Sequence, residues 1–180
     1  TFGERGSGTR WISSLVEAHT SRCQDLTNSY VSGWKHGLWG ERQSLSLGAN
    51  TLIIVAKKDI YAWILSLRKS PWHMPPFRNL TLSEFIRKEY YSICNDRKFQ
   101  TCFDRARTEE MPERPDGKRW PNIIRMWSDK YQAWDAINPS RHRVLHVDYL
   151  STLKNPDSFR QKLSALGIKS KAGSFQIGKY

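Results

Sequence analysis

The sequence GERGSGTRW, residues 3–11, decides the fold because it joins a glycine-rich turn to an apolar helix. Gly3 and Gly8 lie five positions apart, and apolar side chains at spacings of one, three and four then predict a helix over residues 9–18. Such a turn at a helix N-terminus points several backbone N–H groups and the positive end of the helix at one spot, which suits a phosphate. The alternative interpretation is a plain glycine turn.

The same turn departs from the loop of nucleoside triphosphatases. That loop has the form G-x-x-x-x-G-K-[ST], and this chain carries Thr9 where the loop has lysine. No acidic magnesium ligand is obvious after an apolar strand, since Asp59 follows two lysines and fits better as a helix N-cap. Metal-dependent triphosphate hydrolysis is therefore disfavoured, and no metal is expected. The hydroxyls of Ser7 and Thr9 and the guanidinium of Arg10 would add donors for a different phosphate-bearing ligand.

The composition favours one basic domain. The 180 residues suit a single domain with a sizeable core, and no domain-boundary linker or internal repeat is found. The 29 Lys and Arg against 17 Asp and Glu give a net charge of +12, which favours an anionic partner such as a multiply charged nucleotide, an acidic polysaccharide, an acidic lipid or nucleic acid. A well-solvated basic surface is the alternative. No long run of like charge is present, which argues against a disordered nucleic-acid arm.

The three cysteines, Cys23, Cys94 and Cys102, are too few and too scattered for a disulfide scaffold or a zinc site. A Cys94–Cys102 bridge stays open for a secretory protein, and free thiols in a reducing compartment are the simpler interpretation. No apolar stretch approaches the length of a transmembrane helix, so none is expected. A cytoplasmic location is favoured. The Golgi lumen is the alternative if an N-terminal anchor precedes this sequence.

Two strands and their helices are predicted around the glycine turn. The short run TLIIVAK, residues 51–57, is rich in β-branched residues and predicts a strand buried on both faces of a parallel sheet. Asp59 is expected to cap a helix over 60–68. The alternating stretch HRVLHVDYL, residues 142–150, predicts a second strand, and residues 155–168 predict a capped helix.

The middle of the chain is predicted to form two helices separated by a long irregular segment. A helix is expected from Thr81 or Ser83 to about Cys94, and another over about 122–137. The charged, proline-containing stretch 96–121 between them is expected to form a surface excursion or lid. This order of elements predicts a three-layer α/β/α domain with a central parallel sheet and a P-loop-like architecture. Ligands of such sheets bind at the carboxyl ends of the strands, where the glycine turn would lie.

Two of these segments resemble the donor-binding motifs of one enzyme family. GERGSGTRW resembles the 5′-phosphosulfate-binding loop of sulfotransferases that use 3′-phosphoadenosine 5′-phosphosulfate (PAPS). VAKKDIYAWILSLRKSP, residues 55–71, resembles their 3′-phosphate-binding segment, in which a strand ends in a basic residue and a helix bears a serine. Lys58 is the basic residue here, and Ser66 follows eight positions later. The donor carries two separated anionic groups, and the two segments offer two anion sites.

Two further segments match the same family in the same order. VSGWKHGLW, residues 31–39, is similar to the segment that carries a catalytic histidine after a lysine. Residues 146–168 are similar to the family's late strand and helix. The four matches together cover most of the chain and leave 96–121 unmatched. The chain is thus similar to PAPS-dependent sulfotransferases, whose members release adenosine 3′,5′-bisphosphate (PAP).

The resemblance implies a role for each matched residue. His36 would act as the general base that takes the acceptor proton, a task suited to a group that titrates near neutrality. Lys35 would stabilise charge on the transferring group. Trp11 matches a position whose ring stacks on adenine. The expected donor-binding residues are Arg5, Gly6, Ser7, Gly8, Thr9, Arg10, Trp11, Lys58 and Ser66.

Three departures from the family pattern stand out. The family loop commonly has a lysine where this chain has Gly6, so that charge would come from Arg5 or Lys35. Lys58 stands where the family more often has arginine, so a single ammonium charge replaces the two parallel hydrogen bonds that a guanidinium can donate to a phosphate. Lys35 and His36 are adjacent, whereas many members keep a residue between them, which leaves the division of labour between the two open.

Structural explanations stay open for the same residues. His36 could be a surface histidine in a Trp-flanked turn, Lys58 a solvated lysine at a strand end, and Ser66 an exposed helix residue. The basic side chains of the excursion could form a lid that grips an acceptor, although a solvated face is favoured for them: Arg105, Arg107, Arg114, Lys118 and Arg119. Four tryptophans are expected to pack rather than bind a ligand: Trp34, Trp39, Trp63 and Trp72.

The sequence thus predicts an enzyme that transfers a sulfuryl group from PAPS to a hydroxyl or amine. The acceptor is expected to be a small molecule or a glycan, and no nucleic-acid partner is expected. A P-loop nucleotide phosphotransferase is one alternative, and it predicts magnesium dependence. A non-catalytic basic module that binds nucleotides or glycans is another, and it predicts that affinity falls steeply with salt and survives replacement of His36. The sequence leaves the acceptor and the oligomeric state open.

Overall fold

The computed structural model describes residues 1–20, 35–40, 47–48, 51–71, 73–93, 110–111, 114 and 116–168. The predictions for Cys23, Cys94, Cys102, Trp34, Trp72, Arg105 and Arg107 lie outside these residues. The chain, predicted as one domain, groups into two compact units, and each is considered by itself. The first comprises Thr1–His36, Glu41–Asp59 and Ile137–Tyr180, and the second comprises Gly37–Gly40 and Ile60–Ala136.

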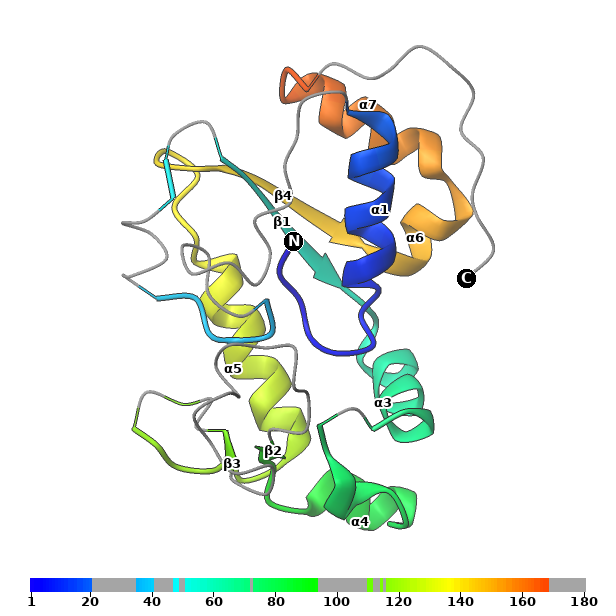
Figure 1. Ribbon diagram of the computed structural model, residues 1–180, viewed down its shortest axis with the longest axis vertical. Coiled ribbons are helices and arrows are strands. Elements are labelled where there is room, and N and C mark those ends of the chain that lie inside the picture. Colours follow the sequence, from blue (N-terminus) through cyan, green and yellow to red (C-terminus); the bar gives the residue numbers. More distant parts are fainter. Residues whose placement is uncertain are drawn as a thin grey trace. The chain divides into compact units, whose positions relative to one another are not determined.

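The first unit contains a small parallel sheet (Figure 1). Its two strands are β1, Leu52–Lys57, and β4, Arg143–Asp148, with Leu52 opposite Arg143 and Lys57 opposite Asp148. Phe2 adds a one-residue parallel bridge to β1, because its N–H donates to Ile54 O at 2.7 Å and its carbonyl accepts from Ala56 N at 2.8 Å. The fold is therefore mixed α/β with parallel strand pairing.

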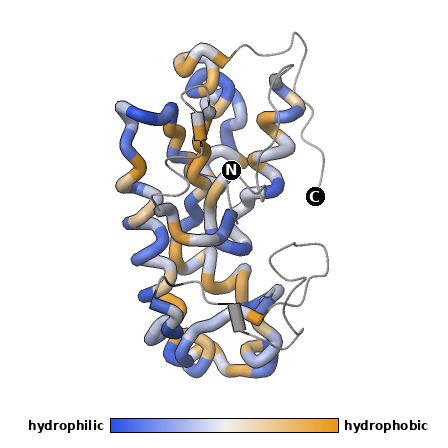
Figure 2. Tube along the Cα trace, turned by 60° about the vertical axis from the view of Figure 1, so that its left-hand side comes forward, coloured by the Kyte–Doolittle hydropathy of each residue, from blue (hydrophilic) through white to orange (hydrophobic). Residues whose placement is uncertain are grey.

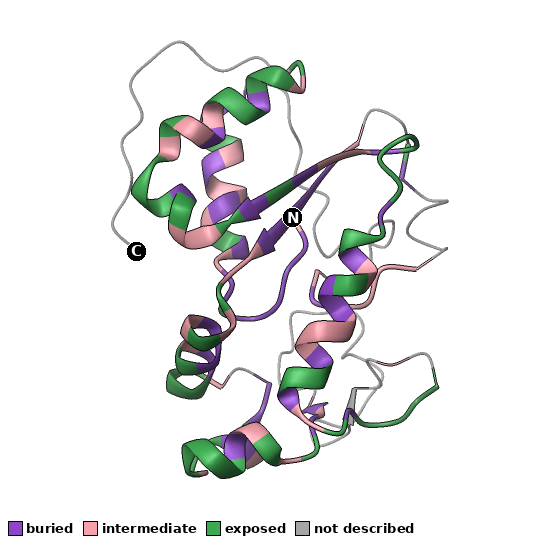
Figure 3. Cartoon of the chain, turned by 180° about the vertical axis from the view of Figure 1, so that it is seen from behind, coloured by how far each residue is buried: buried purple, intermediate pink, exposed green. Residues whose placement is uncertain are grey.

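Two helices cover one face of this sheet, α1 (Thr9–His19) and α7 (Pro156–Ala165). Buried side chains from both helices and from alternate positions of both strands form one apolar cluster: Ile12, Leu15, Ile54, Ala56, Leu145, Val147, Phe159 and Leu163. Ile53 and Val55, which point to the other face of β1, are also buried. Figure 3 shows β1 buried over most of its length, as predicted for this strand.

Three predicted elements of this unit form close to their expected positions. The helix after the glycine turn runs one residue past its predicted end, and β1 matches its predicted range within one residue. The second strand ends earlier than predicted, at Asp148, because the Asp148 side chain caps a short helix, α6 (Tyr149–Lys154), by accepting from Ser151 N. Asn155 then caps α7 in the same way.

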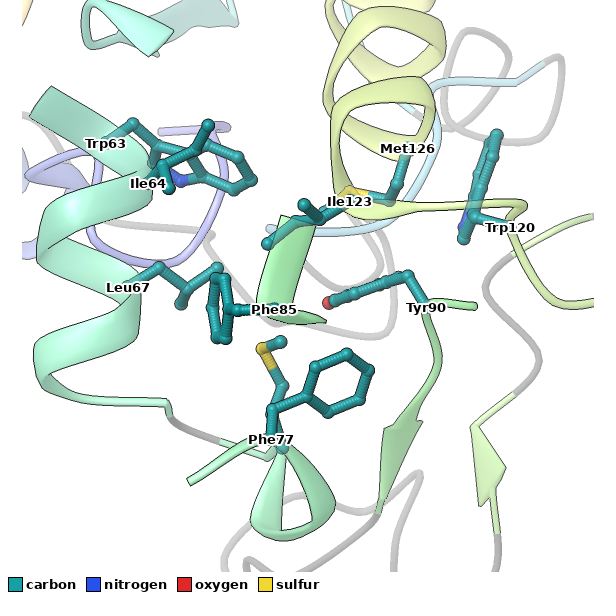
Figure 4. Packing of buried hydrophobic residues seen from close by; sticks show 10 residues of the cluster. Trp63, Ile64, Leu67, Phe77, Phe85, Tyr90, Trp120, Ile123 and Met126 are labelled. Carbon is teal, nitrogen blue, oxygen red and sulfur yellow. The ribbon is translucent and has the colours of Figure 1, made fainter. Parts of the chain in front are cut away.

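The second unit is built mainly from helices. Its elements are α3 (Ile60–Lys69), a 3₁₀ helix η1 (Pro75–Phe77), α4 (Leu82–Arg87), β2 (Ser92–Ile93), β3 (Glu110–Met111) and α5 (Ile123–Asp135). Side chains from α3, η1, α4 and α5 converge on one apolar centre (Figure 4). Phe77 packs against Phe85 and Tyr90, with ring centroids 5.9 and 6.0 Å apart. Trp63 is fully buried in this centre, which agrees with its predicted packing role.

The helix predicted over about 81–94 is much shorter in the structure. The helix begins where predicted, with a capping box formed by Thr81 and Glu84, but α4 already ends at Arg87. The following residues pair with distant segments instead. Tyr90 forms an antiparallel bridge with Trp120, and β2 pairs with β3. Strand pairing across the excursion therefore overrides the local helix propensity of these residues. The same pairing joins the two ends of the stretch that was predicted as a surface lid.

Hydropathy alternates along the described helices (Figure 2). In the part of the chain that the structure describes, no helix has both the length and the apolar character needed to span a bilayer.

Candidate functional site

The glycine turn has the backbone geometry of a tight loop. Gly3 and Gly8 have φ angles of 150° and 84°, in the region that favours glycine. A Cβ on Gly3 would stand 2.5 Å from the carbonyl oxygen of Ala56, and a Cβ on Gly8 would run into the ring of Tyr149. Each position therefore requires glycine for two reasons, the positive φ angle and the lack of space for a Cβ atom.

The N-terminus of α1 begins at this loop without a side-chain cap. Gly8 is its N-cap residue and makes no side-chain cap hydrogen bond, and the first turn of the helix contains no acidic residue. A side chain caps each of the other described α-helices whose N-cap geometry is resolved, namely α4, α5, α6 and α7. The first-turn N–H groups of α1 and the positive end of its dipole thus stand ready for an external anion.

The side chains inside the loop mainly stabilise the loop itself. Glu4 is fully buried, its carboxylate accepts from Arg5 N at 3.2 Å, and it lies 3.6 Å from the Arg5 guanidinium. The Ser7 hydroxyl and the Ser7 N–H both donate to the Glu4 carbonyl, at 2.6 and 3.0 Å. This network shapes the turn from within.

The network bears directly on the predicted donor-binding residues. The side chain of Arg5 is 2% exposed and its guanidinium faces a carboxylate, so part of its charge is already neutralised. The hydroxyl proton of Ser7 is committed to the Glu4 carbonyl. Gly6 and Arg10 are exposed, whereas Thr9 is buried. The parts of the loop that face outward are thus the backbone at Gly6 and the side chain of Arg10.

Lys35 and His36 are fastened to the first glycine of the loop. Gly3 N donates to the Lys35 carbonyl at 3.1 Å, and Nδ1 of the largely buried His36 ring bonds the Gly3 carbonyl at 2.5 Å. A carbonyl can only accept, so Nδ1 carries the proton in this bond. In the neutral ring Nε2 is then the basic nitrogen. The segment with Lys35 and His36 is thereby bound to both the N–H and the carbonyl of Gly3, although it lies more than 30 positions away in the sequence.

Lys58 and Tyr149 follow directly after the two parallel strands. The Lys58 ammonium lies over the Tyr149 ring, 5.1 Å from its centroid. The same ring meets Trp11 edge-on, with centroids 5.5 Å apart and planes at 82°. Parallel strands bring their carboxyl ends to one edge of the sheet, which is where open α/β sheets bind ligands. Lys58 and Tyr149 therefore stand at the expected edge.

Burial changes the chemistry of Lys58. Loss of hydration lowers the pKa of its ammonium from the ordinary value of 10.5. The charged form is thus less stable there than in water, and a bound anion would offset this cost. Half-buried lysines in this setting are candidates for anion binding.

The structure brings most of the predicted site residues into one unit. Residues 5–11, Lys35, His36 and Lys58 all belong to the first unit, and Ser66 lies half-buried on α3 in the second unit. Sequence analysis missed two residues, Glu4 and Tyr149. A charged residue between glycines of a tight turn was the available signal for Glu4, and an aromatic residue directly after a strand was the signal for Tyr149.

Within the described ranges, no three His, Cys, Asp or Glu side chains gather in a way that could hold a metal ion. Trp11 is half-buried at the start of α1, where it contacts Tyr149. Comparison of the chain with protein-family models, with curated proteins and with solved structures finds no match.

Proposed function

We propose that this protein is a PAPS-dependent sulfotransferase that transfers a sulfuryl group to a hydroxyl or amine of a small-molecule or glycan acceptor. The observation that carries the proposal is the pair of hydrogen bonds that fastens Lys35 and His36 to Gly3. A phosphate-type loop and an imidazole base are thereby fixed to each other within one unit. A simple glycine turn has no need of a histidine at this place.

Anion binding supports the proposal from a second direction. The uncapped N-terminus of α1, the exposed side chain of Arg10 and the partly dehydrated ammonium of Lys58 all favour negatively charged groups. They lie on one unit of a chain with a net charge of +12. PAPS supplies a phosphosulfate for the loop and a separate 3′-phosphate for Lys58. Ser66, in the other unit, stays a predicted partner of the 3′-phosphate, and the proposal does not depend on it.

The proposed step is an in-line displacement at sulfur. The acceptor oxygen or nitrogen forms a bond to sulfur while the bond from sulfur to the bridging phosphate oxygen breaks, and PAP leaves with that electron pair. Nε2 of His36 takes the acceptor proton. The α1 N–H groups and Lys35 stabilise the negative charge that grows on the leaving phosphate and on the transferring group. Glu4 and Arg5 hold the loop in shape.

The proposal includes a three-layer α/β/α fold of the P-loop-like type. Its support is the parallel pairing of β1 with β4, the parallel bridge at Phe2 and the cover of α1 and α7 on one face of the sheet. The bridge makes the residue before the loop a strand partner of β1. A strand–loop–helix order at the sheet edge is the arrangement in which such loops bind phosphates.

Calorimetric titration with PAP in the absence of magnesium tests the donor site. We expect binding by the wild type and a loss of about tenfold or more in Lys58→Ala, because an ammonium–phosphate contact is charge-assisted. Lys162→Ala is the matched control, since it removes the same charge from the exposed side of α7 in the same unit. Well-folded wild type that fails to bind PAP would rule out the proposal. Binding of ATP only with magnesium would favour the phosphotransferase.

Replacement of His36 separates catalysis from binding. His36→Asn removes the base while its side-chain amide can still donate to the Gly3 carbonyl. We expect PAP affinity within about twofold of the wild type and transfer from PAPS to slow by about 10²–10⁴-fold. The measurement is PAP release from PAPS over a panel of hydroxyl and amine acceptors. Unchanged transfer in this variant would remove His36 from the mechanism, and affinity that depends only on salt would favour the non-catalytic module.

A further inference from the structure

Tyr149 contacts three separate parts of the candidate site. Its ring lies against Gly8 so closely that a Cβ at that position would overlap it. It meets the Trp11 ring edge-on, and it carries the Lys58 ammonium over its face at 5.1 Å from the centroid. One side chain thus touches the glycine loop, the first turn of α1 and the lysine that follows β1.

The contact with Lys58 fixes a charge. An ammonium within about 6 Å of an aromatic centroid is attracted by the negative face of the ring. The attraction is larger where water is partly excluded, and burial does lower the pKa of Lys58. The lysine side chain is long and flexible, so its contact with the ring restricts the position of the ammonium group.

The contacts with Gly8 and Trp11 fix the ring. Gly8 leaves no space for the ring to shift toward the loop, and the Trp11 ring meets it at 82° on the α1 side. Because the ring is held in this way, the distance from the Lys58 ammonium to the N-terminus of α1 is also held. That distance decides which pairs of anionic groups can use both positions at once.

We propose that Tyr149 is a positioning residue that holds Lys58 away from the loop and thereby makes the site specific for nucleoside 3′,5′-bisphosphates over nucleoside 5′-diphosphates. This inference rests on the proposed donor site. The two phosphates of a 5′-diphosphate are adjacent and can share one helix N-terminus. A 3′-phosphate lies across the ribose and needs a second positive group at a fixed distance. Without the ring, Lys58 would have no fixed distance from the loop, and the site would lose this preference.

The test is the ratio of the dissociation constants of ADP and PAP, each measured by calorimetry without magnesium. Tyr149→Leu removes the ring face, and we expect the ratio to fall by about three- to tenfold. Tyr149→Phe keeps the face and is expected to retain the ratio. Tyr61→Leu is the matched control, because Tyr61 is 76% exposed on α3. A purely structural role of Tyr149 would weaken both ligands equally, so an unchanged ratio in Tyr149→Leu overturns the inference.

A second measurement applies if Tyr149→Leu does not fold. Phenylalanines of increasing fluorination at position 149 keep the shape of the ring and progressively weaken its attraction for a cation. We expect the ratio to fall stepwise along this series, and a flat series overturns the inference. In Lys58→Ala the series should have no effect, because the two residues act as a unit. Wild type that binds PAP with a flat series defeats only this inference, whereas wild type without PAP binding defeats the proposed function itself.

Discussion

Two helices of the first unit begin close to the carboxyl edge of the same sheet, and the N-cap residue of one of them makes a side-chain hydrogen bond whereas that of the other makes none. The N-terminus of α6 is capped by the Asp148 carboxylate, which accepts from Ser151 N at 2.7 Å. The N-terminus of α1 begins at Gly8, which has no side chain to offer. Both helices present N–H groups and a positive dipole end. The protein therefore supplies its own anion to α6, whereas the N-cap residue of α1 supplies none, as the proposed anion site requires.

Glycine gives up the side-chain cap at a small cost. Ser, Thr, Asp or Asn at the N-cap stabilises a helix by only a few tenths of a kcal/mol over glycine, and the chain uses such residues at Thr81, Asn122, Asp148 and Asn155. At Gly8 the ring of Tyr149 fills the space that a cap side chain would need. The comparison thus links the missing side-chain cap of α1 to the anion site proposed there. Four changes test this comparison.

The largest effect is expected from Gly8→Ala. The new Cβ would overlap the Tyr149 ring, and alanine would have to adopt the left-handed backbone conformation that glycine adopts at this position. We therefore expect a loss of about 2–5 kcal/mol in the free energy of unfolding. Gly167→Ala is the matched control, since φ there is 74° and nothing lies near its Cβ. Its loss should stay near 1–2 kcal/mol, roughly the backbone cost alone. Urea unfolding measures both, and equal losses would contradict the contact between Gly8 and the ring.

Arg10→Glu should move stability and binding in opposite directions. A negative charge in the first turn of α1 favours the helix by about 0.3–1 kcal/mol, and the same charge repels an anionic ligand. We expect the melting temperature to rise slightly and PAP affinity to fall by at least about tenfold. Arg141→Glu, in the turn that precedes β4 at the opposite end of the strand, makes the same charge change. Its effect on PAP affinity should be small, and equal effects would point to net charge alone.

Asp148→Ala removes the cap of α6. We expect a loss of about 1 kcal/mol in stability, and a gain of up to about threefold in PAP affinity because a nearby negative charge disappears. Asn155→Ala removes a neutral cap from α7 and serves as the control. Its stability loss should be similar, while PAP affinity stays constant. A drop in PAP affinity in Asp148→Ala would contradict the division of roles between the two helices.

The smallest effect is a dependence of binding on pH. Burial lowers the folded-state pKa of Lys58, so the folded protein binds fewer protons than the unfolded chain between that pKa and 10.5, and this contribution makes stability rise with pH in that window. An anion favours the charged ammonium, so PAP affinity should fall by a few-fold as pH rises through the same window, with proton uptake on binding. Calorimetry in buffers of different ionisation enthalpy detects the uptake. Lys58→Arg should abolish it, because arginine stays charged.

Locally encoded features of the fold could be predicted from the sequence. Glycines at positions 3 and 8 followed by an apolar 3.6-residue pattern gave the loop and α1, and the β-branched run gave β1. The helix starts predicted at Thr81 or Ser83 and at about residue 122 also match the structure, in which Thr81 and Asn122 are the N-cap residues of α4 and α5. Each of these signals acts over a few residues, so the surrounding structure does not need to be known.

Features that depend on distant contacts could not be predicted. The early end of α4 at Arg87 follows from pairing of Tyr90 with Trp120, 30 residues away. The same limit applies to the candidate site. The sequence offered Lys35 and His36 as candidates, but only the fold shows them bound to Gly3. The role of Arg5 was expected to be donor binding, and its burial beside Glu4 could not be inferred from a charged residue next to a glycine.

The contact between Gly8 and Tyr149 also constrains how this protein can change during evolution. A side chain at position 8 and an aromatic ring at position 149 compete for one volume. A lineage that acquires a capping residue at position 8 must first shrink the residue at 149, and it then loses the ring that holds Lys58. In descendants of this sequence a capping residue at position 8 should therefore occur only together with a small residue at position 149, and specificity at the proposed donor site should drift wherever the ring at 149 has been lost.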